Sequence, residues 1–284
     1  MSVAARLKRF VKLWVDLFAR HDLLNHASSI AFAVLKALVP LTLLGLAVLG
    51  AVGQRRVWQE TILPRVQSHV QPATAHAIDV AAEKIFSTNS TGLIVFASLL
   101  TLWYVSGSVR GVMSATNSVY GCEETRSWKH RYPISLGLAA AITLCVVGAI
   151  LVVLAAPTLA RNGALQVVVA IGRWLVAVAL LALAVGLLVR FAPVEPRPNT
   201  WVSGGSILVI LAWVAATLIF QLLVTTLLNF KSATGNLGVF LVLSGYVYTS
   251  AIIFLVGVEV DELLREDAKE GQAGLLHMLG IARQ

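Results

Sequence analysis

Residues 27–52 read ASSIAFAVLKALVPLTLLGLAVLGAV, and Lys36 is the one charged residue in the stretch. An α-helix needs about 20 mostly apolar residues to cross the hydrocarbon core of a bilayer. The stretch meets that length, so it predicts a membrane-spanning helix. It is also longer than the apolar core of a signal peptide, and we therefore expect a retained span.

The composition of the whole chain agrees with a membrane protein. Of its 284 residues, 58% are hydrophobic and 13% are charged, whereas soluble domains are about 45–50% apolar and about 25% charged. A soluble globular protein is therefore excluded. The pattern predicts an all-α, polytopic membrane helix bundle with six transmembrane helices, at about residues 27–52, 92–110, 133–155, 166–190, 202–228 and 237–258.

Two further segments belong to this predicted bundle. Residues 3–20 place basic and apolar side chains on opposite helix faces, which is typical of an amphipathic helix at the interface and also of a helix packed on the bundle. Residues 54–91 predict one or two short helices outside the membrane. We expect a single membrane domain over 1–284, divided into an amphipathic helix (1–25), the six-span bundle (26–260) and a cytoplasmic tail (261–284).

Basic residues predict the orientation, because cytoplasmic loops carry an excess of Lys and Arg. If the N-terminus is cytoplasmic, that side holds 14 of the 22 basic residues: Arg6, Lys8, Arg9, Lys12, Arg20, Arg110, Arg126, Lys129, Arg131, Arg190, Arg197, Arg265, Lys269 and Arg283. The other side holds six: Arg55, Arg56, Arg65, Lys84, Arg161 and Lys231. We therefore expect both termini in the cytoplasm.

Lys36 and Pro40 interrupt the first apolar block near its middle. A cation at the centre of a spanning helix costs about 2.5–3.5 kcal/mol on insertion scales. Proline has no N–H group, so the carbonyl of Lys36 loses its helical hydrogen-bond partner. One interpretation is a polar notch that contacts an anionic or polar cargo in an internal cavity. The other is a lysine that snorkels or forms a structural ion pair.

Glu259 lies at the end of the last apolar block. It is either a buried carboxylate that pairs with Lys36 or Arg110 or couples a proton, or an interfacial carboxylate that marks the helix end. Its depth favours the second interpretation. Arg110 and Asn117 are seven residues apart, on one face if their helix continues. Arg110 would hold a phosphate or carboxylate through its planar fork, or serve as a topological anchor.

Trp103 and Arg190 complete the candidate cavity residues, at the second and fourth blocks. We expect no catalytic residues, metal site or cofactor, because the chain has no HExxH, GxSxG, P-loop or dinucleotide-binding motif. The basic residues do not cluster with aromatics as nucleic-acid binding requires, so we expect no nucleic-acid partner. The expected partners are membrane lipids and a lipid or small-molecule cargo. No pattern in the sequence specifies an oligomeric state.

Several short motifs occur in order along the chain: Ala31-Phe32 with Leu38-Val39-Pro40-Leu41; Leu102-Trp103-Tyr104 with Arg110, Asn117, Tyr120-Gly121 and Glu124-Thr125-Arg126-Ser127; Arg190-Phe191-Ala192-Pro193 with Arg197 and Gly204-Gly205; and Gly235-Asn236-Leu237-Gly238 with Tyr248 and Gly257-Val258-Glu259. Over about residues 25–265 they resemble the YihY/virulence factor BrkB family of bacterial inner-membrane proteins. Ala33 and Ala37 depart from that pattern, in which Tyr and Ser are common, and Lys36 is not part of it.

The resemblance implies six transmembrane helices with cytoplasmic ends. The family is linked to serum resistance and envelope integrity and is often described as transporters, and some members carry the label ribonuclease BN. Our first hypothesis is a transporter or flippase-like protein for a lipid or small polar envelope component, and the alternative is a non-transporting envelope scaffold. A ribonuclease ranks third, because the short polar loops lack a recognisable metal site or acid–base pair facing water.

Overall fold

The computed structural model describes residues 3–69, 71–88, 90–155, 163–195, 204–227 and 233–270. Throughout these ranges the regular structure is helical, and they contain no β-strand. Four basic residues from the charge count lie outside the ranges: Arg161, Arg197, Lys231 and Arg283. So do the part of the predicted tail that follows residue 270 and the two ends of the predicted span 202–228.

Five described helices are long and apolar enough to cross a membrane: α2 (Leu23–Ala51), α6 (Ser90–Val119), α7 (Trp128–Ala155), α8 (Gly163–Phe191) and α10 (Ala233–Glu270). A sixth helix, α9 (Gly204–Leu227), is apolar over the shorter range Leu208–Val224. Each predicted span therefore coincides with a helix. The expected all-helical, polytopic membrane fold is confirmed.

Short helices connect α2 to α6 at one end of the bundle. They are α3 (Arg55–Val57), the π-helical turn η1 (Trp58–Ile62), α4 (Leu63–His69) and α5 (Pro72–Ser87). A small apolar cluster holds them against the end of α2 and includes Leu49, Val57, Trp58, Ala82 and Phe86. The indole nitrogen of Trp58 also donates a hydrogen bond of 2.9 Å to Asp79. The predicted outer segment is thus folded onto the bundle.

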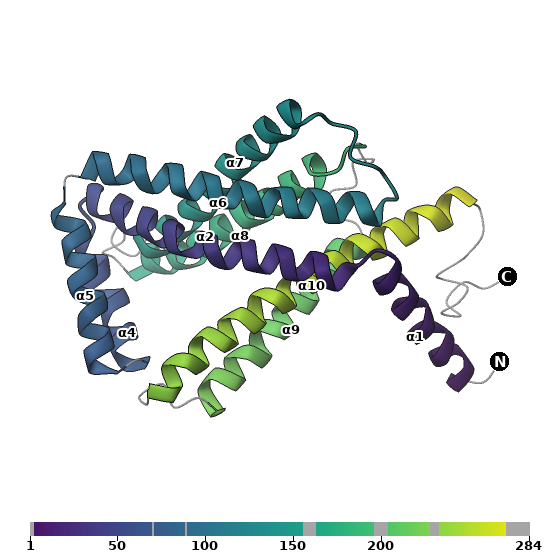
Figure 1. Cartoon of the computed structure of the whole chain (residues 1–284). Coiled ribbons are helices and arrows are strands. Elements are labelled where there is room, and N and C mark those ends of the chain that lie inside the picture. The colour runs from purple at the N-terminus through teal and green to yellow at the C-terminus, as the bar shows by residue number, and fades with distance from the viewer. Residues whose placement is uncertain are drawn as a thin grey trace.

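The long helices form three antiparallel pairs. Helices α2 and α6 lie side by side at the centre, α7 packs on α8, and α9 packs on α10. The second pair joins the centre through α7 and α6, and the third joins it through α10 and α2. Figure 1 shows these pairs meeting at the end that carries α1 (Val3–Arg20) and spreading apart toward the end that carries α4 and α5.

The main apolar core explains this shape, because it occupies only one end of the bundle. Its members include Leu23 at the start of α2, Met113 near the end of α6, Ala139 in the first half of α7 and Leu255 in the second half of α10. Ala192, just after α8, is also fully buried there. The small side chains of Ala139 and Ala192 let the helices approach closely there. We call the end of the bundle that contains this core the convergent end.

Away from the convergent end, α8 and α9 present large apolar side chains on their outer surfaces. Examples are Trp174 and Leu175 on α8 and Leu211, Leu218 and Leu222 on α9, each more than half exposed. Exposed leucine and tryptophan on long apolar helices are suited to lipid, which solvates them at no cost. The surface of the described helices therefore agrees with a multi-pass membrane protein.

Candidate functional site

A part-buried histidine–carboxylate pair joins the start of α2 to α10 at the convergent end. His21 lies in the two-residue connection between α1 and α2, and Glu259 lies in α10. Nδ1 of His21 is 2.9 Å from Oε2 of Glu259, and the Glu259 side chain is only 2% exposed. A hydrogen bond of 3.2 Å from the Ser118 hydroxyl to the His21 carbonyl fixes this connection on α6. Three long helices therefore meet around the pair.

A small pocket of about 140 Å³ opens beside this pair. Its polar lining comes from Arg20, His21, Glu259 and Glu262, and its apolar lining includes Leu17. Glu262 is buried and forms an ion pair with Arg265 one helical turn later. The pocket thus contains acidic and basic groups, and the volume suits water or a small ion rather than a whole lipid.

A second polar network, the junction cluster, consists of Asn117, Glu124, Arg126 and Arg131. Glu124 accepts hydrogen bonds from Asn117 Nδ2 at 3.0 Å and from Arg126 Nε at 2.8 Å. Arg131 Nε lies 3.7 Å from the same carboxylate. The side-chain hydrogen bond from Arg126 lowers the pKa of the Glu124 carboxyl, the positive charges of Arg126 and Arg131 add to this effect, and burial opposes it. Glu124 is therefore held as a carboxylate in the loop between α6 and α7.

The junction cluster also holds the segment that follows α8. Arg126 Nη2 donates a hydrogen bond of 2.9 Å to the carbonyl of Ala192, and the amide of Val194 donates one of 3.0 Å to Oδ1 of Asn117. Asn117 uses both ends of its amide, since its nitrogen bonds to Glu124. It is buried, so unmade bonds would be costly there. The cluster therefore fixes α6, α7 and the end of α8 relative to one another.

Arg110 occupies a separate polar site between α6 and α7. Its guanidinium donates hydrogen bonds to the buried hydroxyls of Ser106 and Ser135, the latter at 3.3 Å. Its Cζ lies 4.5 Å from the centre of the Tyr132 ring, and a cation over an aromatic face is attracted by the ring. The side chain is half-buried. Arg110 thus attaches α7 to α6 through both polar and aromatic contacts.

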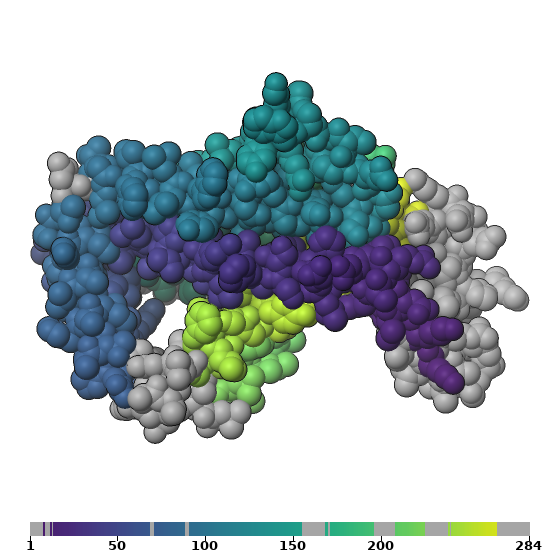
Figure 2. All heavy atoms as spheres, in the orientation of Figure 1, coloured from purple at the N-terminus to yellow at the C-terminus, as the bar shows by residue number. Residues whose placement is uncertain are grey.

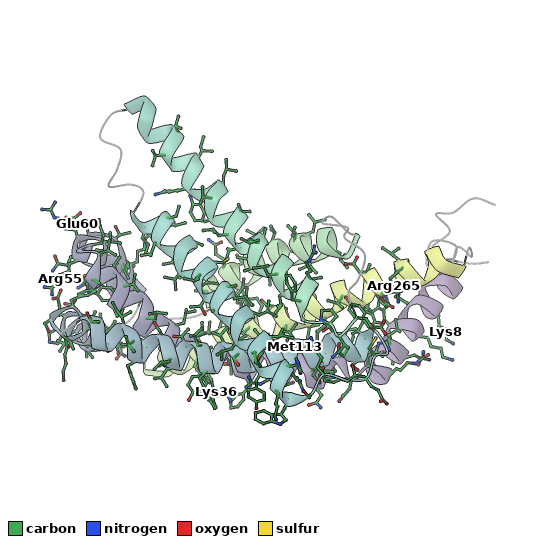
Figure 3. The ribbon with its side chains drawn as sticks, turned by 90° about the horizontal axis from the view of Figure 1, so that it is seen from above. Lys8, Lys36, Arg55, Glu60, Met113 and Arg265 are labelled. Carbon is green, nitrogen blue, oxygen red and sulfur yellow. The ribbon has the colours of Figure 1, made fainter. Side chains whose placement is uncertain are left out.

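Lys36 lies on the outer surface of α2. Its ammonium is 4.4 Å from the centre of the Phe32 ring, and both side chains are exposed. Figure 3 shows Lys36 at the edge of the molecule, pointing away from the other helices. Pro40 lies inside α2 and is buried. The Lys36 ammonium of the predicted polar notch therefore faces outward from the bundle and not into an internal cavity.

The structure does not bring the predicted cavity residues to one place. Glu259 pairs with His21, and neither Lys36 nor Arg110 is its partner. It also lies within α10, which continues to Glu270, so the interpretation that Glu259 marks the end of its helix is wrong. The remaining two candidates, Trp103 and Arg190, are exposed on α6 and at the end of α8. Of the seven predicted residues, only Asn117 and Glu259 belong to the two polar groups at the convergent end.

His21 and the role of Glu124 and Arg126 were missed by reasoning from residue types. A histidine among the polar residues before the first span has no distinguishing pattern, and its partner is 238 positions away. Glu124 and Arg126 carried a signal only as part of the Glu-Thr-Arg-Ser motif. Within the described ranges, no three His, Cys, Asp or Glu side chains group as metal ligands.

Comparison with known proteins identifies the family. YfkH of Bacillus subtilis (strain 168), named as a ribonuclease-like protein, is 22% identical over 272 residues, which cover 92% of this chain and 96% of the relative. No solved structure matches the chain. The model of the family described as "Virulence factor BrkB" matches residues 15–276. This range contains both polar groups of the convergent end, and the chain belongs to the virulence factor BrkB family.

Proposed function

We propose that this protein moves a lipid or a small polar envelope component across the bacterial inner membrane, with both termini in the cytoplasm. The observation that carries the proposal is the part-buried His21–Glu259 pair, which lies beside a pocket lined by residues of α1, of α10 and of the end of α6. Ionisable groups inside a membrane protein are costly to insert and commonly mark a path for ions or substrate. A purely structural contact between α2 and α10 would need only apolar side chains.

The arrangement of the helix pairs supports an alternating opening. The pairs are packed together at the convergent end and separated at the other end (Figure 1). In many transporters, helix groups rock against one another around a fixed region. Breaking the His21–Glu259 contact would remove the polar link between α10 and the start of α2 and so favour opening of the convergent end, where apolar packing also holds these helices together. The pair would then act as the gate of the transport path.

Charge supports the proposed orientation. The convergent end carries Arg20, Arg126, Lys129 and Arg131 around the ends of α1, α6 and α7. Cytoplasmic segments near spanning helices are enriched in such residues. The convergent end would therefore face the cytoplasm, and α4 and α5 would lie on the opposite side of the membrane.

We further propose that the protein catalyses no covalent reaction. Two carboxylates at the convergent end are each engaged by a basic side chain, Glu124 by Arg126 and Glu259 by His21. Such contacts favour the joining of helices over general acid–base chemistry, which needs a group within reach of a substrate. The ribonuclease-like name of the relative makes RNA cleavage by nuclease-free purified protein the observation that would overturn this part of the proposal.

Lipid movement in proteoliposomes tests the main proposal. The probes are fluorescent phosphatidylglycerol and phosphatidylethanolamine, with a membrane-impermeant quencher reporting transfer between leaflets. We expect the wild type to accelerate transfer over empty vesicles, and Glu259→Gln to slow it by about tenfold, a change of about 1.4 kcal/mol in the barrier. Glu123→Gln, which removes an exposed carboxylate near the same end, is the matched control. Equal rates with wild type, Glu259→Gln and empty vesicles would contradict lipid transport.

The position of α1 favours a second function, that of an envelope scaffold. Among the described elements α1 packs chiefly on α2, and Figure 1 shows it leaving the bundle at the convergent end. Its exposed Lys8 and Lys12 suit an anionic membrane surface or an acidic partner. A variant without residues 1–20 discriminates between the functions. Normal folding and lipid transfer together with a lost envelope phenotype would favour the scaffold.

A further inference from the structure

A line of exposed polar side chains runs along one face of α2. It starts with Asp22, which precedes the helix, continues through Asn25 and Ser29, and resumes at Lys36 beyond the exposed Phe32 ring; all four polar residues are exposed. Steps of three, four and seven residues return to nearly the same side of a helix. We call these four residues the polar stripe. Figure 2 shows α2 (purple) crossing the molecular surface between α6 above it and α10 below it.

The polar stripe ends at a cation halfway along a spanning helix. Lys36 is 13 residues after Leu23 and 15 before Ala51, so about 20 Å of helix separates it from either end. Figure 3 shows it between Lys8 and Arg265 at one end and Arg55 and Glu60 at the other. That distance exceeds the reach of a four-carbon side chain, so snorkelling alone does not bring the ammonium into water.

No described carboxylate neutralises this cation. Among the described residues, the ion pairs involve other side chains, and the Lys36 ammonium contacts the ring of Phe32. Phe32 is itself 64% exposed, so the ring covers one side of the ammonium and leaves the other open. An anionic group from outside the chain is therefore the complement that this position requires.

An apolar groove begins within one turn of Lys36. It has a volume of about 350 Å³ and is lined by Leu38, Val39, Thr42, Leu43 and Leu46 of α2, with Ile85 of α5 at its far end. Nine residues from Leu38 to Leu46 extend for about 12 Å along the helix. A groove of this length and character fits part of a hydrocarbon chain. The cation and the groove together thus match the two parts of one amphipathic molecule.

We propose that α2 binds an anionic phospholipid from the surrounding bilayer, with its headgroup phosphate at Lys36 and an acyl chain in the groove. The headgroup would reach Lys36 along Asn25 and Ser29, while the lipid tails stay in the bilayer. This binding site is therefore on the outer face of the bundle. This inference deepens the proposed function by naming the substrate class, and it rests on that function for the movement of the lipid, although not for its binding.

A second copy of the chain fits this face less well. Copies inserted with the same topology and related by a two-fold axis place identical residues at the same depth. Contact through the middle of α2 would therefore bring two Lys36 ammonium groups together in a region of low dielectric, where like charges repel strongly. The one acidic residue of the stripe, Asp22, lies at the end of α2 and bonds to Asn25, so it is too distant to relieve this repulsion.

Lipid retention by the purified, full-length protein tests the proposal. Native mass spectrometry would count phosphatidylglycerol and phosphatidylcholine molecules retained by the wild type, Lys36→Met and Lys36→Arg after equal loading. We expect the wild type to prefer phosphatidylglycerol, Lys36→Met to retain about tenfold less of it, and Lys36→Arg to stay close to the wild type. Lys129→Met, which removes an exposed lysine from α7, should retain phosphatidylglycerol as the wild type does.

Three results would overturn the proposal: equal retention by Lys36→Met and the wild type, no preference for the anionic lipid, or a dimer that Lys36→Met dissociates. If Lys36→Met does not fold, Lys36→Gln compared with Lys36→Arg decides in the same way. The transfer assay separates this inference from the proposed function. If lipid retention depends on Lys36 but no lipid is transferred, the site at Lys36 is supported and transport is rejected. If lipid is transferred but retention does not depend on Lys36, transport is supported and the site is rejected.

Discussion

His21 and Glu259 form a 2.9 Å contact that connects the start of α2 to α10 across 238 positions of the chain. Replacing either residue deprives a nearly buried polar group of a partner, which costs about 1–3 kcal/mol. We expect His21→Ala and Glu259→Gln each to lower the stability of the purified protein by that amount. The double variant should lose less than the sum of the two. Thermal unfolding in detergent gives the stability of the wild type, the two single variants and the double variant. If the stability losses of the two single variants add up to that of the double variant, the two side chains do not interact.

The junction cluster makes stability depend on pH through Glu124. The Arg126 hydrogen bond lowers the pKa of this carboxyl below its ordinary value of 4.5, and the charges of Arg126 and Arg131 add to the effect. A carboxyl with a lower pKa in the folded state stabilises the protein fully above its unfolded pKa. That contribution is lost as the pH falls through the folded pKa. We therefore expect a loss of stability below pH 4.5 that Glu124→Gln does not show.

Melting temperatures between about pH 7 and pH 3 measure this difference. Above pH 4.5 the variant should be less stable than the wild type by about 1.5–3 kcal/mol, the range for hydrogen bonds to a charged group. Glu123→Gln, at the exposed neighbouring position, should keep the pH profile of the wild type. Parallel profiles for the wild type and Glu124→Gln would mean that another carboxyl controls the acid response.

Gly50 and Gly45 offer a matched test of packing within α2. A Cβ atom at Gly50 would lie 2.9 Å from Cδ1 of Phe86, whereas a Cβ at Gly45 would meet nothing within 4 Å. The Phe86 ring is buried and packs edge-on against Trp58 at 6.2 Å, so it has little room to move. We expect Gly50→Ala to destabilise the protein by about 1–3 kcal/mol through overpacking. Gly45→Ala should be neutral or stabilise by up to about 1 kcal/mol, and equal melting temperatures would contradict the close approach of α5.

Replacement of Arg110 by lysine should destabilise the protein, although the positive charge is kept. Lysine lacks the planar fork that bonds Ser106 and Ser135 and the flat surface that stacks on Tyr132. We expect Arg110→Lys to lower stability by about 1–2 kcal/mol, and Arg56→Lys, at an exposed position outside the membrane helices, to stay within about 0.5 kcal/mol. Chemical denaturation in mixed micelles measures both. If Arg110→Lys is as stable as the wild type, this position requires only a positive charge.

Apolar blocks were sufficient to predict the spanning helices, because length and hydropathy decide which segments enter the bilayer. They were insufficient for the helix ends. The block 92–110 corresponds to α6, which extends to Val119 because the polar residues beyond Arg110 have partners in the folded protein. Asn117, for example, is buried against Glu124 and Val194. Those contacts depend on tertiary structure, which hydropathy does not report.

The candidate site was less predictable for the same reason. Glu259 was interpreted either as an interfacial carboxylate, which its depth favoured, or as a buried carboxylate that pairs with Lys36 or Arg110. The folded chain instead places His21 against it. Lys36 was recognised from its depth alone, and only the structure showed which way it points. Depth can be read from position in an apolar block, whereas the direction of a side chain depends on how the helices pack.

The confinement of the core to the convergent end also has a consequence for biogenesis. Chains are synthesised and inserted from the N-terminus, yet the core around Leu23 and Ala27 is completed by Phe254 and Leu255 of α10. A nascent chain with α2 through α9 inserted would lack the Glu259 carboxylate beside His21 and the apolar cover of α10. Release from the insertion machinery before α10 is complete would leave this half-built region open to quality-control proteases. Helix α10, made long after α2, is thus the one that completes the core around the start of α2.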